Sequence, residues 1–221
     1  MNDYQLQDVD REEIEDVLTK LESSFGFKFG LRELQHVTTF GELCNVVINK
    51  IDLTEATDCT SQQAFYKLRQ AFRFVAPHVP VLPDTELKLL LPWRQRRQLW
   101  RLLEQQLGFK HKMLGMSAFA AGALGITVLA SFVALFIDHV VGMTGIGLAI
   151  MAAIVLEETG KALRVKTVRE CVEQMTCEQY LKSRRNPETV NRTEVTKKVQ
   201  ALFMNMLLLK SSALTPDAPL V

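Results

Sequence analysis

Residues 113–156 decide the fold, and they read MLGMSAFAAGALGITVLASFVALFI, then Asp138-His139, then VVGMTGIGLAIMAAIVL. The first run, 113–137, has 25 residues without a charge, and the second, 140–156, has 17. A helix needs about 20 apolar residues to cross a bilayer core of about 30 Å. Two such runs joined by two polar residues predict a transmembrane helical hairpin. The alternative is a pair of buried core helices, but such helices are usually shorter and carry a polar stripe.

Basic residues flank both outer ends of the hairpin, whereas the connecting turn has no Lys or Arg. Because Lys and Arg collect on the cytoplasmic side of membrane proteins, both flanking parts are expected in the cytoplasm. This predicts a two-span protein of a bacterial inner membrane, in contact with membrane lipid, with both termini cytoplasmic. The flanking residues are Arg94, Arg96, Arg97, Arg101, Lys110 and Lys112 before the hairpin, and Lys161, Arg164, Lys166 and Arg169 after it.

Small residues recur at every fourth position in each apolar run. This spacing lets two helix backbones approach closely, so contact within the hairpin is the first interpretation and a homo-oligomer is the second. Neither run contains an ionisable residue, which disfavours a transport pathway. The residues expected to support span packing are Ser117, Ala121 and Gly125 in the first run, and Gly145, Ala149 and Ala153 in the second.

The composition outside the hairpin limits the function. The 26 basic and 25 acidic residues leave a net charge of +1, which gives no reason to expect a nucleic-acid partner. Four cysteines are scattered without a CxxC pair, so free thiols and no metal site are expected in a reducing cytoplasm. No HExxH, GxSxG or Gly-rich phosphate loop is present, and neither catalytic activity nor a cofactor is predicted.

The flanking sequence has the periodicity of amphipathic helices. Ile14, Val17, Leu21 and Phe25 recur at helical spacing, and no stretch alternates as a strand would. The whole chain is therefore predicted to be all-α: small helical bundles plus the two-helix hairpin. Similar stripes are formed by Leu43, Val46, Val47 and Ile51, by Phe65, Leu68, Phe72 and Val75, by Trp93, Trp100, Leu103 and Leu107, and by Val195, Val199, Leu202 and Met206.

Three pairs of short segments echo one another, which indicates an internal repeat. One member of each pair lies near an end of the chain and the other lies nearer the hairpin. The pairs are LESSFGFK (21–28) with LEQQLGFK (103–110), TFGEL (39–43) with TVREC (167–171), and TPDAPL (215–220) with LPDTEL (82–87).

These motifs resemble those of the acyl carrier proteins, which fold as four-helix bundles. In that family a TPDxxL-like loop follows the first helix, an LExxFGIxF-like pattern ends the second, and a TVx(D/E)L motif starts the fourth. The resemblance implies second to fourth helices in 8–51, a first helix and loop in 192–221, a first and second helix in 61–110, and a fourth in 166–175. The hairpin would replace the short third helix. The implied segments are 1–53, 54–110, 111–160, 161–190 and 191–221.

Residues 191–221 would supply the first helix that the N-terminal segment lacks. Within one chain this gives a permuted bundle, and between chains it gives a head-to-tail assembly that need not close. The sequence leaves both possibilities open.

The chain departs from the carrier family at the attachment site. A working carrier has Asp-Ser-Leu at the start of its second helix, and the Ser bears the phosphopantetheine arm. Counting back from Phe25 and Leu107, the matching positions fall near Arg11 and Trp93, and no Asp-Ser pair occurs in the chain. No attached phosphopantetheine and no ordinary carrier chemistry are therefore expected.

The two second-helix segments carry opposite charge. The acidic one resembles the carrier helix that binds basic patches on partner enzymes, and it is equally typical of a solvated helix start. The basic one suits anionic headgroups, or the acidic helix of a carrier or of this same chain. The acidic residues are Asp8, Asp10, Glu12, Glu13, Glu15 and Asp16, and the basic residues are Arg94, Arg96, Arg97 and Arg101.

The expected function is that of a non-enzymatic inner-membrane scaffold with pseudo-carrier domains, docking carrier proteins or acyl-transfer enzymes near lipid-linked synthesis. A small oligomeric channel or transporter subunit is the alternative. The uncharged spans argue against that alternative.

Overall fold

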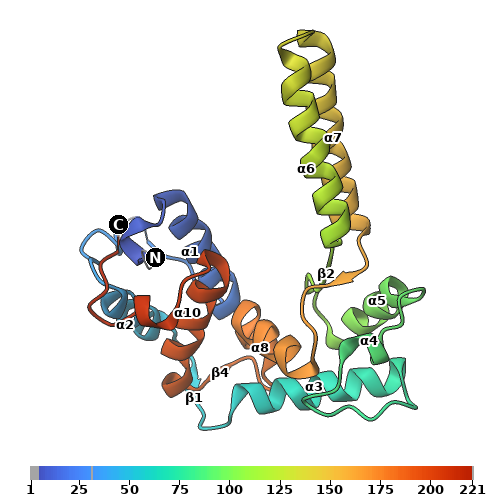
Figure 1. Cartoon of the computed structure of the whole chain (residues 1–221). Helices are drawn as coiled ribbons and strands as arrows, with labels where there is room; N and C mark the ends of the chain where they lie inside the picture. Colours follow the sequence, from blue (N-terminus) through green and yellow to red (C-terminus); the bar gives the residue numbers. More distant parts are fainter. Residues whose placement is uncertain (1–4, 31, 221) are drawn as a thin grey trace. The chain divides into compact units, whose positions relative to one another are not determined.

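The helices follow the apolar stripes read from the sequence, and the chain is all-α as predicted (Figure 1). The computed structural model describes residues 5–30 and 32–220. The helices are α1 (Arg11–Phe25), α2 (Phe40–Lys50), α3 (Thr60–Val75), α4 (Leu87–Leu90), α5 (Arg96–Leu107), α6 (Ala118–Leu135), α7 (His139–Thr159), α8 (Val168–Glu178), α9 (Tyr180–Ser183) and α10 (Arg192–Leu207), with 3-10 turns η1 (Leu6–Asp8) and η2 (Ser211–Ala213).

Short strands, which no sequence pattern predicted, join some of the connecting segments. β1 (Thr54–Glu55) pairs in parallel with β4 (Thr189–Val190), and β2 (Leu114–Gly115) pairs antiparallel with β3 (Ala162–Leu163). Each strand has two residues, which is too short for the alternation that marks a strand in sequence.

By its contacts the chain divides into two units, residues 1–70 with 172–221 and residues 71–171. The division groups the five segments expected from the sequence into two, and its boundaries fall inside α3 and α8. The ends of the chain therefore belong to one unit, and its middle, with the apolar hairpin, belongs to the other.

In the first unit, α10 packs against both α1 and α2, so residues 191–221 complete the N-terminal bundle within this chain. Phe203 of α10 is fully buried and meets Phe40 of α2 edge-on, with ring centroids 5.3 Å apart. At the far end of α1, the Ser24 hydroxyl donates to the Cys177 carbonyl (2.7 Å) and accepts from the Tyr180 amide (3.0 Å). Segments distant in sequence thus share one core.

The two loops containing Pro-Asp are held in the same way in the two units. Residues 216–220 run beside 38–41 through backbone hydrogen bonds of 2.8, 2.9 and 2.8 Å, made by the amides of Gly41, Phe40 and Leu220. Residues 83–87 run beside 166–169 through bonds of 2.7, 3.0 and 2.8 Å at the equivalent positions. The echo between TPDAPL and LPDTEL is thus matched by shared backbone geometry.

The start of the following helix is capped in a similar way in the two units. The Glu42 carboxylate accepts from the Thr38 amide and the Glu170 carboxylate from the Lys166 amide, each at 2.7 Å. The Glu42 and Glu170 amides donate in return to the hydroxyls of Thr39 and Thr167. At α2 a further bond from the Thr39 amide to Glu42 (3.2 Å) completes a capping box. The hydrogen bonds, foremost the one from the Thr38 amide, lower the pKa of Glu42.

The ends of α1 and α5 also match. Gly26 and Gly108 follow the two helices in the left-handed conformation, at φ 70° and 79°, where a side chain would be strained. The Glu22 carboxylate accepts from the amide of Phe29 (2.7 Å), and that of Glu104 accepts from the amide of His111 (2.9 Å). All three sequence echoes therefore correspond to repeated local structure.

The hairpin helices α6 and α7 lie side by side and antiparallel (Figure 1). They are the two helices among the described residues that are long and apolar enough to cross a membrane. Their contact uses glycines of α7: a Cβ added at Gly142 would lie 2.5 Å from the Leu135 side chain, and one at Gly145 would clash with the Ser131 hydroxyl. Ala149, four residues after Gly145 on α7, is also buried.

The small residues expected to line the first span do not make this contact. Ala121 and Gly125 are exposed, and Ser117 instead caps α6 by accepting from the Ala120 amide (3.2 Å). In the second span Gly145 and Ala149 do lie at the contact, and Ala153 is partly buried. The face of α7 at this contact carries Gly142 and Gly145, and the facing side of α6 carries Ser131 and Leu135.

The base of the hairpin is closed by the β2–β3 pair. A Cβ added at Gly160 would clash with the Gly115 carbonyl oxygen, so the entering and leaving chains are in backbone contact. Glu157 at the end of α7 accepts from the Met116 amide (3.0 Å) and pairs with Arg164.

The Phe203→Ala substitution tests the core shared by the two ends of the chain. It should lower the free energy of unfolding of the first unit by about 3–5 kcal/mol, because it removes a buried ring and leaves a cavity. Hydrogen exchange measured by mass spectrometry on the full chain in detergent should report lost protection in α1 and α2. Thr196→Ala, on the exposed face of α10, is the control, and unchanged protection of α1 and α2 in Phe203→Ala would contradict the shared core.

Candidate docking surfaces

Arg11 and Trp93 lie where the resemblance to carriers would place the modified serine, and both side chains are exposed. Arg11 opens α1 and pairs with Glu15 at 3.3 Å on the open surface. Trp93 lies in the turn before α5, with 54% of its surface exposed, and not on the helix face with Trp100 that the sequence suggested. Neither side chain offers a hydroxyl for esterification.

The acidic residues gather over the start of α1 and form what we call the acidic surface. They belong to η1, to the residue preceding α1 and to its first two turns, and all are exposed. Negative charge at a helix N-terminus opposes the helix dipole favourably, so the surface also stabilises α1. Its members are Asp8, Asp10, Glu12, Glu13, Glu15 and Asp16.

The basic residues divide between surface and interior. Arg94 and Arg101 are exposed and Arg97 is partly exposed, as a docking surface requires. Arg96, expected on that surface, is instead buried, and burial lowers the pKa of its guanidinium. Its Nε donates to the Leu91 carbonyl (2.9 Å) and its Nη1 to the Lys161 carbonyl (2.8 Å). We call the exposed set Arg94, Arg97 and Arg101 the basic surface.

Aligning α1 and α5 on Gly26 and Gly108 exposes how the two repeats differ. Glu12 and Glu15 of the first correspond to Arg94 and Arg97 of the second. Ile14, buried in the first, corresponds to the buried Arg96. The same helix therefore presents opposite charge in the two units, and one apolar core position has become a hydrogen-bonding one.

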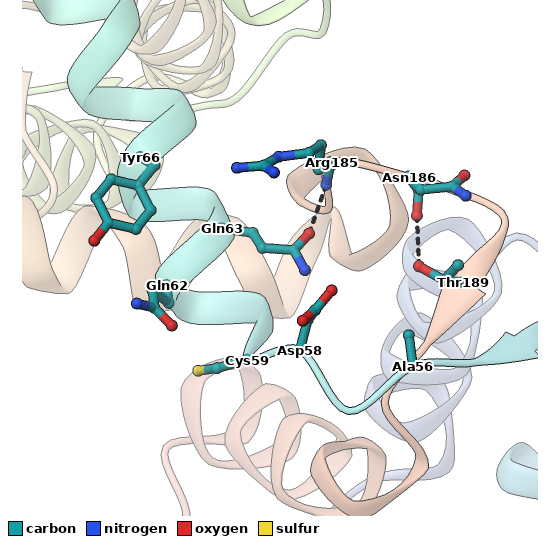
Figure 2. A pocket seen from close by; sticks show the side chains of 9 residues that line it. All are labelled: Ala56, Asp58, Cys59, Gln62, Gln63, Tyr66, Arg185, Asn186 and Thr189. Atoms are coloured by element: carbon teal, nitrogen blue, oxygen red, sulfur yellow. Dashed lines mark hydrogen bonds between the residues drawn. The ribbon is translucent and has the colours of Figure 1, made fainter.

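A polar pocket of about 410 Å³ opens in the first unit, between the start of α3 and the segment that leads into β4 (Figure 2). The Arg185 amide donates to the Gln63 side chain (2.7 Å), and the Thr189 hydroxyl donates to the Asn186 carbonyl (2.8 Å). No sequence motif pointed to it, because its residues come from two segments far apart in the sequence, 56–66 and 185–189. The lining residues are Ala56, Asp58, Cys59, Gln62, Gln63, Tyr66, Arg185, Asn186 and Thr189.

Arg184 lies buried next to this pocket, with 1% of its surface exposed. Its guanidinium donates to the hydroxyls of Thr189 (3.1 Å) and Thr60 (2.6 Å) and to the Asp58 carbonyl (3.3 Å). It also lies over the Tyr180 ring, 5.8 Å from the centroid. These contacts tie the start of α3 to β4, so Arg184 is a structural cation.

The cysteines and histidines do not assemble into a site in the described part of the chain. There, no three His, Cys, Asp or Glu side chains are placed to hold a metal ion. Cys44, Cys171 and Cys177 are buried free thiols, and Cys59 is an exposed one.

Comparisons of this chain with protein families, with curated proteins and with solved structures find no match. Its likeness to acyl carrier proteins therefore rests on the motifs and on the residues quoted for them.

Arg184→Met should destabilise the first unit by about 2–4 kcal/mol, because it leaves buried hydroxyl and carbonyl groups without their donor. The neighbouring Arg185→Met is the control: Arg185 is exposed, so its replacement should change stability by about 0.5 kcal/mol or less. Pulse proteolysis of the full chain in urea measures both. Equal urea midpoints of unfolding for the two variants would show that the hydrogen bonds of Arg184 do not stabilise the first unit.

Proposed function

We propose that this protein is a non-enzymatic scaffold of a bacterial inner membrane, anchored by the α6–α7 hairpin, whose pseudo-carrier units dock acyl-transfer enzymes or carrier proteins in the cytoplasm. The observation that carries the proposal is the pair of matched helical frameworks, each with a non-hydroxyl residue at the serine position, flanking an apolar hairpin.

The surface of the hairpin supports its placement in lipid. More than half of the surface is exposed for side chains such as Phe119 and Phe132 on α6, Phe136 directly after it, and Leu148 on α7. A continuous apolar surface of this length is unfavourable in water and favourable in hydrocarbon.

The few hydroxyls of the hairpin also suit a lipid environment. Thr127 donates to the Ala123 carbonyl (2.9 Å), Ser131 to Thr127 (2.8 Å) and Thr144 to Val140 (2.8 Å). Each hydroxyl proton is thus satisfied within its own helix, as hydrocarbon demands.

Charge supports the orientation. The turn between the helices holds Asp138, whose carboxylate caps α7 by accepting from the Val140 amide (2.8 Å), and His139. The basic residues all lie at the other end of the hairpin, which favours a cytoplasmic location for both units.

The acidic surface supports docking. It has the negative charge by which carrier helices bind basic patches on enzymes. Six carboxylates are exposed on it, and Arg11 is the basic residue that lies among them in the sequence. Complementary charge of this kind steers association and weakens with salt. Without the serine, a unit would occupy a carrier-binding surface and deliver no acyl group.

Site-directed labelling tests the membrane topology. Burial raises the pKa of Cys44 and of Cys171 to about 12, and that of Cys177 to about 11, so Cys59 should be the thiol that reacts with a membrane-impermeant maleimide near pH 8. It should react only after the cells are opened. His139→Cys adds a thiol that should react in intact cells. Labelling of Cys59 in intact cells, or release of the protein by alkaline carbonate, would contradict the topology.

Affinity purification in detergent, followed by mass spectrometry, tests the docking function. Carrier proteins or acyl-transfer enzymes should be recovered with the native chain and lost, by about tenfold or more, with Glu12→Arg/Glu15→Arg, since two like charges replace two opposite ones. Glu173→Arg/Glu188→Arg, which reverses two other exposed carboxylates of the first unit, is the matched control.

Two results would overturn this function. One is an intact mass that includes phosphopantetheine, since the units would then be working carriers. The other is recovery of the chain alone, as a defined oligomer that conducts ions after reconstitution.

A further inference from the structure

The segment around the basic surface exposes apolar side chains that nothing in the second unit explains. Leu89, Trp93 and Leu102 are 57%, 54% and 44% exposed. Trp93 precedes Arg94 and Leu102 follows Arg101 directly in the sequence, Arg97 lies between them, and no acidic residue occurs between Glu86 and Glu104. Trp with Arg is the composition typical of a surface that lies in the interface of a bilayer, with rings at headgroup depth and cations on phosphates.

Arg96 holds the exposed ring in place. Its guanidinium lies over Trp93, 5.2 Å from the ring centroid, while the same group donates to the carbonyls of Leu91 and Lys161. A buried cation with these partners fixes a tryptophan that remains half exposed. The ring is therefore presented outward by a rigid support, rather than by a freely moving turn.

The same helix is tied to the chain where it enters and leaves the hairpin. Arg96 bonds Lys161, two residues after α7 ends at Thr159, and the Trp100 indole donates to the His111 carbonyl (3.1 Å), seven residues before α6 begins. Two residues of extended chain reach about 7 Å. That distance is about the thickness of the headgroup region on one side of a bilayer.

The geometry points to the following site: residues 89–102 form an interfacial anchor on the cytoplasmic leaflet, with Trp93 at headgroup depth and Arg94, Arg97 and Arg101 bound to the phosphates of anionic lipids. This inference rests on the proposed membrane insertion of α6 and α7. The acidic surface, which carries Glu12 and Glu15 where this segment has Arg94 and Arg97, is repelled by the same leaflet. Charge thus assigns lipid to one repeat and soluble partners to the other.

The test uses the full chain reconstituted in vesicles of phosphatidylcholine, with or without phosphatidylglycerol, and with bromine-labelled acyl chains that quench nearby tryptophan. Trp93 and Trp100 are the two tryptophans, so Trp93→Phe gives the contribution of Trp100. We expect Trp93 to be quenched more in anionic vesicles. Arg94→Gln/Arg97→Gln/Arg101→Gln should reduce that quenching by about half or more, and so should added salt.

Arg11→Gln/Lys182→Gln/Lys197→Gln removes the same charge from exposed positions of the first unit and should leave the quenching unchanged. Protection of His139→Cys from an external thiol reagent in vesicles that enclose the turn reports insertion separately. If the external thiol reagent labels His139→Cys without opening of these vesicles, the hairpin is not inserted and the proposed membrane anchoring fails.

With the hairpin inserted, two results overturn the interfacial anchor. One is Trp93 quenching that is unaffected by the three Gln substitutions. The other is protection of Trp93 from quenching by the brominated lipid that rises with protein density in neutral vesicles and is lost in Glu12→Arg/Glu15→Arg. That result would show that the basic surface binds the acidic surface of a second copy.

Discussion

The packing of α10 between α1 and α2 is the contact on which the rest of the structure depends. Neither α1 nor α2 can bury its apolar stripe alone, and short isolated helices are unstable in water. The helix that covers both stripes lies about 140 residues further along the chain, at its other end. The first unit is therefore made from both ends of the chain, and the residues between them must start and end close to it. The second unit, residues 71–171, is inserted there.

Much of this arrangement can be predicted from the sequence, because capping needs particular side chains. Thr39 and Glu42 form a capping box that only a few residue types can make, and Gly26 occupies a backbone conformation that favours glycine. The same residues recur in the second repeat for the same reason. The echoes therefore identified where helices begin and end. They left open whether residues 191–221 complete the N-terminal bundle of the same chain or of another copy.

The parts that the sequence did not predict depend on contacts between distant segments. Arg96 looks like a member of a basic surface, yet its guanidinium is satisfied by a carbonyl 65 residues away, which no local pattern reveals. The contacts of Arg184 and the pocket beside it join residues 56–66, which include the start of α3, to residues 184–189, and these two segments meet only in the folded chain. In the hairpin, several faces of α6 carry small residues, and spacing alone could not choose among them.

The two repeats show how one framework can serve two environments. Backbone hydrogen bonds and caps are nearly identical in the two units, so the framework does not depend on the charges of the exposed side chains of α1 or α5. Those exposed positions are thus free to differ, and they carry acids in the repeat away from the hairpin and arginines in the repeat that contains it. At one matched core position, Arg96 replaces Ile14 and bonds the chain leaving α7, so this change in the core is explained by the inserted hairpin itself.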